Sequence, residues 1–322
     1  MRAIRVAATG GPEVLEHTEV EAPDPQPGQL LVQVAAAGVN FIDTYQRSGI
    51  YPMPLPHTPG SEGAGKVVAV GADVTGFSVG DRVGWAMAPG SYAEQALVPA
   101  DKAVRVPDGV DDPTAAAALL QGLTAHYLIT STHPVRTGET ALVHAAAGGM
   151  GLLLTQLIKS RGGNVIGTVS TPEKEKLARE AGADEIIRYT EEDVAKEVED
   201  LTDGRGVDVV YDGVGKTTFD ASLASLRPRG LLALFGASSG PVPPVDPQRL
   251  NAAGSVFLTR PSLAHHILTR EELDWRAAEL FAWITQGTVK IRIGATYPLA
   301  DARRAHEDLE GRRTTGKLLL LP

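Results

Sequence analysis

The 322-residue sequence contains no cysteine, which excludes disulfide bonds and every metal site built on thiolates. It also has no uninterrupted apolar run near the roughly 20 residues of a membrane span, and its first residues lack the apolar core of a signal peptide. A net charge of -9 provides no basic field for a phosphate backbone. We therefore expect a cytoplasmic protein without a membrane span and without nucleic acid as its main partner.

The residues that are present are typical of a globular protein, with 43% hydrophobic and 21% charged side chains. The length predicts two domains. Up to about residue 120, short apolar or alternating runs such as 29–34 and 65–70 are separated by Pro and Gly turns, which predicts a barrel-like β domain. Strand and helix patterns alternate regularly over 141–236, which predicts a parallel sheet with helices on both faces.

The C-terminal part of the chain changes character again. An amphipathic helix is expected around residues 274–284, followed by strand candidates at 290–293 and 317–321. These two strands could return to the first domain, which would then be discontinuous in sequence.

A strand, a glycine-rich turn and a helix follow one another between Thr140 and Arg161. Glycines at 148, 149 and 151 remove the Cβ atoms that would block close backbone approach. The helix that follows directs unpaired N–H groups and a positive dipole end at an anion. This segment therefore predicts a dinucleotide pyrophosphate site.

The residues after the next predicted strand indicate which dinucleotide is bound. An Asp or Glu at this place usually marks NAD, but the chain has Val169-Ser170-Thr171 instead. Lys174 falls in the first turn of the following helix, where a cation opposes the helix dipole at a cost of roughly 0.3–1 kcal/mol. A ribose 2′-phosphate would reverse that sign, so NADPH is favoured over NADH. The alternative is a solvated lysine in an alternating Glu-Lys surface.

A longer set of motifs resembles the quinone oxidoreductase and zeta-crystallin family of the medium-chain dehydrogenase/reductase superfamily. The signature positions are Gly138, Glu139, Leu142, 146–149, Gly151, Gln156 and Lys159, and further matches are 38–43, 59–63, 121–127, 235–240 and 314–317. The resemblance spans essentially the whole chain. It implies a GroES-like β-barrel substrate domain of residues 1–122 and 263–322, and a Rossmann-type doubly wound NADPH-binding domain of residues 123–262.

The same resemblance bears on zinc. Zinc-dependent members of the superfamily carry a cysteine where Asn40 stands and a histidine where Ser61 stands, and they have a four-cysteine lobe after the segment that matches 80–83. Asp43 and Glu62 are present, but two carboxylates without thiolate or imidazole make a poor zinc site. We expect no metal at either place.

The resemblance also assigns residues to the site. Catalytic candidates are Asn40, Asp43 and Tyr51, with Tyr51 as the candidate donor of a hydrogen bond or proton. Residues implied in NADPH binding are Asn40, Tyr45, Gln121, Thr124, Gly148, Gly149, Met150, Gly151, Ser170, Lys174, Tyr189, Phe235, Gly236, Ser238, Arg260 and Lys317. The alternatives are a packing aromatic for Tyr51 and a local turn cap for Asn40 and Asp43; Lys317 departs from the small residue common in its segment.

Without a Lewis acid, alcohol oxidation by the zinc mechanism is disfavoured, whereas an electron-poor acceptor needs mainly alignment with the nicotinamide. The expected activity is NADPH-dependent reduction of small quinones. An enoyl or enone reductase, including a biosynthetic tailoring enzyme, uses the same chemistry and stays open. An RNA-binding or structural zeta-crystallin-like role is an alternative of another class. The resemblance further implies a homodimer paired through the apolar edge strand at 256–258.

Overall fold

The computed structural model describes all residues, 1–322, and the chain divides into two compact units. Unit 1 comprises Met1–Leu123, His266–Gly287 and Ile291–Pro322, and unit 2 comprises Thr124–His265 and Thr288–Lys290. None of the helices combines the length and the apolar character needed to cross a lipid bilayer.

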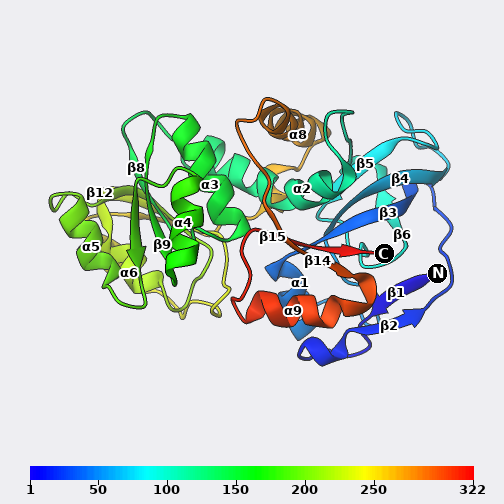
Figure 1. Ribbon diagram of the computed structural model, residues 1–322, viewed down its shortest axis with the longest axis horizontal. Helices are drawn as coiled ribbons and strands as arrows, with labels where there is room; N and C mark the ends of the chain where they lie inside the picture. The colour runs from blue at the N-terminus through cyan, green and yellow to red at the C-terminus, as the bar shows by residue number, and fades with distance from the viewer. The chain divides into compact units, whose positions relative to one another are not determined.

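Unit 1 is built on a mainly antiparallel sheet, in which only the last two strands of the chain pair with each other in parallel (Figure 1). Its strands are β1 (Arg2–Arg5), β2 (Glu16–Glu19), β3 (Gln29–Val39), β4 (Glu62–Val70), β5 (Arg82–Ala86), β6 (Gln95–Pro99), β7 (Ala103–Arg105), β14 (Ile293–Pro298) and β15 (Lys317–Leu321). The main path is β14-β15-β3-β4-β5-β7, with β6 paired to β3, while β1 and β2 pair with each other. The sequence predicted a barrel-like β domain, and these pairings form its sheet without closing it into a ring.

The two C-terminal strands join this sheet, as expected, but the strand predicted at 290–293 was misplaced. β14 begins only at Ile293. The backbone of Lys290 is instead bound by the Gln156 side chain, which accepts from its N–H at 2.8 Å and donates to its carbonyl at 3.2 Å. Because a side chain of unit 2 uses those backbone groups, Lys290 cannot pair as part of the strand, whereas the Arg292 carbonyl accepts from the backbone N–H of Lys317 at 2.8 Å.

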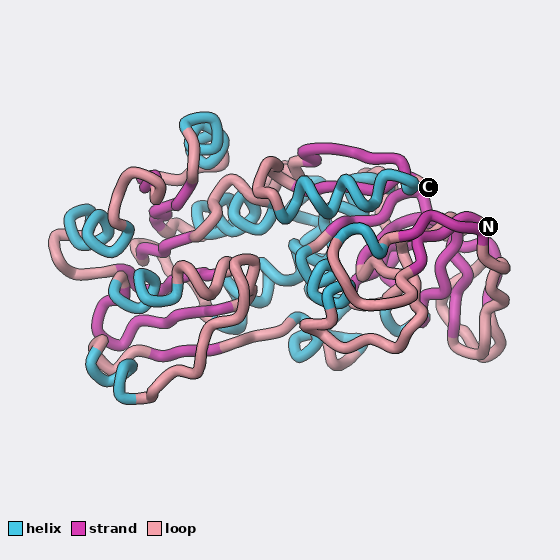
Figure 2. The backbone as a smooth tube through the Cα atoms, turned by 90° about the horizontal axis from the view of Figure 1, so that it is seen from below, coloured by secondary structure: helices cyan, strands magenta, loops and turns pink.

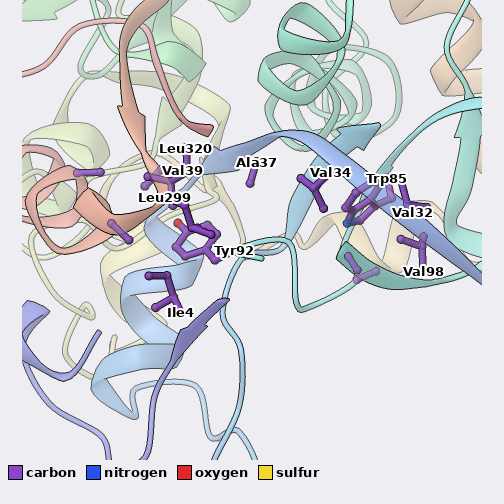
Figure 3. Packing of buried hydrophobic residues seen from close by; sticks show 14 of the residues in the cluster. Ile4, Val32, Val34, Ala37, Val39, Trp85, Tyr92, Val98, Leu299 and Leu320 are labelled. Atoms are coloured by element: carbon purple, nitrogen blue, oxygen red, sulfur yellow. The ribbon is translucent and has the colours of Figure 1, made fainter. Parts of the chain in front are cut away.

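The core of unit 1 collects the inward residues of β3, where Leu30, Val32 and Val34 are buried and Gln33 between them is exposed. This alternation is what a strand with one apolar face produces. Figure 3 shows Val32 and Val34 beside Trp85, which is also fully buried. Both ends of the chain lie in unit 1 and are near each other in Figures 1 and 2.

Four longer helices accompany these strands: α1 (Phe41–Ser48), α2 (Asp112–Tyr127), α8 (Arg270–Thr285) and α9 (Ala302–Glu310). Helix α1 follows β3 directly. It starts after the extended N-cap Asn40 and ends at Gly49, whose φ of 83° favours glycine. This short helix positions three predicted site residues.

Unit 2 is a six-stranded parallel sheet connected through helices. Its elements are β8 (Thr140–Val143), α3 (Gly149–Ser160), β9 (Asn164–Val169), α4 (Pro172–Glu180), β10 (Glu185–Arg188), α5 (Val194–Leu201), β11 (Val207–Asp212), α6 (Phe219–Ala224), β12 (Leu226–Leu234), α7 (Gln248–Ala252) and β13 (Phe257–Thr259). Helices α3 and α4 pack on β8, β9 and β10, whereas α6 packs on β11 and β12 (Figure 1). The predicted alternation of strands and helices is confirmed.

The strand order is β10-β9-β8-β11-β12-β13. From β8 the chain adds β9 and β10 on one side, and then returns to add β11, β12 and β13 on the other side of β8. This is the order of a doubly wound dinucleotide-binding fold, in which ligands bind beyond the carboxyl ends of the strands at the reversal. The glycine-rich turn follows β8 and therefore lies at that point.

Candidate functional site

The glycine-rich turn leaves the end of β8 and enters α3 at Gly149. Gly148 is the N-cap and offers no side chain to the first N–H groups of the helix, which stay available to an anion. A Cβ on Gly151 would lie 2.3 Å from the carbonyl oxygen of Ala145, so only glycine allows this close turn. The backbone of Gly148, Gly149, Met150 and Gly151 thus fits a pyrophosphate.

Three predicted ligands of the adenosine end gather beyond β9 and β10. The Lys174 ammonium donates to the Ser170 hydroxyl at 3.3 Å, and Thr171 caps α4 by accepting from the backbone N–H of Lys174. The backbone N–H of Tyr189 donates to the Val169 carbonyl at 3.2 Å, and 40% of Tyr189 is exposed. A cation, a hydroxyl and an accessible aromatic ring therefore lie at one edge of the sheet.

The remaining predicted ligands in unit 2 follow β12 and β13. The backbone N–H groups of Phe235 and Gly236 donate to the Asp212 carbonyl, and that of Ser238 donates to Gly213 at 3.2 Å. A Cβ on Gly236 would lie 2.4 Å from the Gly213 carbonyl oxygen, so this loop also needs glycine. Arg260 follows β13 at the same edge of the sheet. The one predicted ligand of unit 2 that follows neither strand at this point is Thr124, which lies on α2 and is 9% exposed.

The predicted residues of unit 1 lie on and beside α1. The rings of Tyr45 and Tyr51 pack edge to face with centroids 5.3 Å apart; Tyr45 is buried, whereas Tyr51 is 39% exposed. Gln121 lies on α2 and is half-buried. Asn40 and Asp43 are both buried, and the Asp43 carboxylate accepts from the backbone N–H of Asn40 at 2.9 Å.

A buried ion pair fixes the Asn40 side chain. The Lys317 ammonium donates to Glu62 Oε2 at 2.5 Å and to Asn40 Oδ1 at 2.6 Å. Asn40 Nδ2 donates to the same Glu62 oxygen at 2.9 Å and to the Gly38 carbonyl at 3.3 Å. Glu62 also accepts from the backbone N–H of Leu120. Lys317, expected to contact a phosphate of the coenzyme, is thus 2% exposed and held by unit 1.

A second set of buried side chains forms a chain of hydrogen bonds that ends at Asp43. Ser61 and Tyr92 donate their hydroxyl protons to the two Asp43 carboxylate oxygens at 2.8 and 3.0 Å. Tyr92 also meets His306 Nε2 at 3.1 Å, and His306 Nδ1 meets Arg47 at 3.0 Å. Burial raises the pKa of the Asp43 carboxyl to about 6, against the hydrogen bonds from Ser61 and Asn40 that lower it.

The direction of donation along these hydrogen bonds follows from Arg47, whose guanidinium group can only donate. His306 Nδ1 must therefore accept, which leaves the proton on Nε2 to face the Tyr92 oxygen. Burial, with the Arg47 charge adding to it, lowers the pKa of His306 to about 3, so the ring is neutral. Arg47 itself is paired with Glu310 at 2.8 Å. Arg47, Tyr92 and His306 were not predicted from the sequence, because no local pattern signals contacts between residues so distant in sequence.

The residues present do not fit a zinc ion at the positions that hold it in zinc-dependent dehydrogenases. Asn40 and Ser61 supply an amide and a hydroxyl, and Glu62 is already neutralised by the Lys317 ammonium. A dication beside that ammonium would be repelled and would lack the nitrogen and sulfur ligands it prefers. No group of three or more His, Asp or Glu side chains that could hold a metal occurs in the structure.

The fold and these sites define a two-unit dehydrogenase with a dinucleotide-binding sheet. Two family models match the chain: one described as an alcohol dehydrogenase GroES-like domain over residues 26–108, and one as a zinc-binding dehydrogenase over residues 149–283. The chain belongs to the quinone oxidoreductase family of the medium-chain dehydrogenase/reductase superfamily.

Individual relatives are similar over the full length. The quinone oxidoreductase of Pseudomonas aeruginosa is 50% identical over 100% of this chain and 99% of its own. The 2-haloacrylate reductase of a Burkholderia species is 43% identical over 97% of this chain and 96% of its own. A mycobacterial protein solved in complex with NADPH is 58% identical, with a TM-score of 0.97 and 100% of both chains covered.

The buried carboxyl group of Asp43 predicts a pH-dependent effect of Asp43→Asn. Because its pKa rises from 3.8 to about 6 on folding, its bound proton stabilises the fold below about pH 4, and this contribution is lost as pH rises through 6. The wild-type unfolding free energy should therefore fall, relative to Asp43→Asn, by up to ~3 kcal/mol between pH 4 and 7. The new amide can donate to Ser61, whose hydroxyl can turn to Gln46 Oε1, 3.4 Å away.

Urea unfolding at several pH values measures this difference. Asp24→Asn, at an exposed carboxylate, is the matched control and should show a smaller change over the same range. A difference between wild type and Asp43→Asn that does not vary with pH would contradict the raised pKa.

Proposed function

We propose that the protein is an NADPH-dependent quinone reductase that transfers hydride to small quinones without zinc. The observation that carries the proposal is the gathering of the glycine turn, Ser170, Lys174 and Tyr189 at the carboxyl edge of the parallel sheet. The NADPH complex of the mycobacterial relative and the name of the Pseudomonas relative support it. When bound, NADPH supplies the hydride from its nicotinamide ring.

We assign the coenzyme contacts according to these positions. The backbone of the glycine turn would bind the pyrophosphate, and the segment after β12 would meet the nicotinamide ribose or ring. The proposed contacts are Asn40, Tyr45, Gln121, Thr124, Gly148, Gly149, Met150, Gly151, Ser170, Lys174, Tyr189, Phe235, Gly236, Ser238 and Arg260. Lys317 is left out of this set because its ammonium is buried on Glu62 and Asn40.

The choice of NADPH over NADH rests on Lys174, and Lys174→Glu tests it. A carboxylate beside Ser170 would repel the 2′-phosphate of NADPH and leave the ribose of NADH without that repulsion. The KM for NADPH should rise by about tenfold or more, and the KM for NADH should change much less. Steady-state kinetics with both coenzymes measure this. Lys176→Glu, an exposed lysine of the same helix, is the control, and equal changes for both coenzymes would remove Lys174 from the site.

In this proposal the residues that act on the acceptor belong to unit 1. Tyr51 is the proposed donor of a hydrogen bond to the oxygen that is reduced. A phenol can polarise a carbonyl while staying neutral near pH 7. We assign Asp43 a positioning role, because it is fully buried and accepts from Asn40, Ser61 and Tyr92. Asn40 keeps one lone pair on Oδ1 with which it can accept from a ligand.

If hydride placement dominates the rate, Tyr51→Phe should lower kcat for a quinone by about tenfold or less. The phenylalanine keeps the ring that packs on Tyr45 and loses only the hydroxyl. Tyr297→Phe, whose hydroxyl binds Asp308 at 2.9 Å, is a control for loss of a phenol in unit 1. Initial rates at saturating NADPH give the comparison; a loss of several orders of magnitude would make Tyr51 an essential acid.

Reduction of an activated carbon–carbon double bond is the second candidate, and the 2-haloacrylate reductase among the relatives favours it. Hydride delivery to the β-carbon of an enone or acrylate uses the same alignment. A panel of benzoquinones, naphthoquinones, enones and haloacrylates, followed by the loss of reduced-nicotinamide absorbance, separates the two. We expect turnover with quinones; turnover only with enones or acrylates would transfer the assignment, and turnover with none would leave a binding role.

We further propose a homodimer paired through β13, the last strand of the unit 2 sheet. Phe257 on this edge is 62% exposed, and an apolar sheet edge favours pairing with another strand. A monomeric mass in light scattering would contradict this.

The functional division into residues 1–122 with 263–322 and 123–262 also stays a proposal, and a cytoplasmic location stays a prediction. The negative charge disfavours an RNA-binding role.

A further inference from the structure

A buried chain of hydrogen bonds joins the ends of three strands of unit 2 to α6. Thr168 Oγ1 on β9 lies 3.1 Å from His144 Nδ1, which follows β8. His144 Nε2 lies 2.9 Å from Ser222 Oγ on α6, and Ser222 donates to Asp212 Oδ2 of β11 at 2.7 Å. All four side chains are at most 4% exposed. None of them belongs to the proposed coenzyme contacts.

The proton positions along this chain follow from its two ends. The Asp212 carboxylate accepts the Ser222 proton, so the Ser222 oxygen accepts from His144 Nε2. His144 Nδ1 then accepts the proton of Thr168, because burial lowers the pKa of the ring and keeps it neutral. The lone pairs of the Thr168 oxygen are thereby directed elsewhere, and one accepts from the backbone N–H of Ala145 at 3.3 Å.

Ala145 is the residue that turns the chain from β8 into the glycine turn. Its φ is 51°, in the left-handed region that disfavours every residue with a side chain except in special positions. Its methyl group is exposed and gains no packing that could offset this. The conformation is held by hydrogen bonds: Ala145 N–H to Thr168 Oγ1, Ala146 N–H to the Thr168 carbonyl at 3.0 Å, and Gly148 N–H to the Ala145 carbonyl at 2.8 Å.

We propose that Thr168 and His144 are positioning residues for the coenzyme: they hold Ala145 in its left-handed conformation and thereby fix the glycine turn that receives the pyrophosphate. The proposal rests on the proposed function, in which this turn binds NADPH. It adds two buried residues that act through Ala145 and touch no coenzyme atom. A strained backbone at a ligand site persists only where its surroundings determine it, and here those surroundings are the Thr168 hydroxyl and its histidine partner.

Thr168→Val tests the proposal, because it keeps the shape of the side chain and removes the hydroxyl. The freed turn should relax toward ordinary backbone conformations, so the Kd for NADPH should rise roughly tenfold, the equivalent of the usual left-handed penalty. Titration of NADPH fluorescence measures Kd without turnover. kcat at saturating NADPH should change little, since the bound coenzyme restores the turn.

Two further variants separate positioning from simple loss of stability. Ala145→Gly in the Thr168→Val background should restore the Kd, because glycine adopts a φ of 51° without penalty. Thr155→Val makes the same change at another fully buried threonine of unit 2, whose hydroxyl has no hydrogen-bond partner, and should leave the Kd unchanged. If Thr168 only stabilised the fold, a glycine at the exposed position 145 would not restore the Kd for NADPH.

Should Thr168→Val fail to fold, Ser222→Ala removes the acceptor that orients His144 while leaving Thr168 in place. It should also raise the Kd, again with rescue by Ala145→Gly. If Thr168→Val or Ser222→Ala binds NADPH with the normal Kd, the positioning role is overturned and the proposed function is not. The same holds if the Kd rises and Ala145→Gly does not restore it. Absence of NADPH binding by the unmodified protein overturns the proposed function together with it.

Discussion

The parallel pairing of β8 between β9 and β11 is the constraint on which the coenzyme side of the molecule depends. In the register observed, Leu142 lies opposite Ile166 on one side and Val210 on the other. Because all the strands run the same way, every segment that leaves a carboxyl end emerges at one edge of the sheet. The glycine turn and the Ser170–Lys174 segment, apart in sequence, meet there for that reason. Polar side chains at the strand ends then fix the turn itself.

Unit 1 meets a different constraint, which is the cost of burying charge. Lys317 with Glu62, and Arg47 with Glu310, are opposite charges in contact, which offsets much of that cost. Asp43 is surrounded by neutral donors, and the residual penalty appears as its raised pKa. The positions where related enzymes hold a metal are thus occupied by an internally satisfied polar network, built around an ammonium in place of a dication.

The sequence predicted the local part of this architecture well. Periodicity and glycine spacing predicted the alternating elements of unit 2, and the strand predicted at 317–321 in unit 1 matches β15 to the residue. It failed where a contact joins distant segments: the strand expected at 290–293 is displaced because Gln156 binds the backbone of Lys290. The burial of Lys317 on Glu62 is likewise invisible to local patterns, since 255 positions separate the two residues. Such pairings depend on the tertiary fold, which no window of sequence contains.

The hydrogen bonds of Asn40 limit the chemistry that unit 1 can offer an acceptor. Both of its amide hydrogens are already donated, to Gly38 and Glu62, so toward a ligand it can only accept. Asp43 is fully buried and cannot reach a substrate. A carbonyl oxygen undergoing reduction needs a donor, and among the catalytic candidates only Tyr51 can supply one. In the proposed reaction, with this phenol as the donor and no zinc, the electron deficiency of the acceptor has to favour hydride transfer, and quinones and conjugated carbonyl compounds possess this deficiency whereas simple ketones lack it.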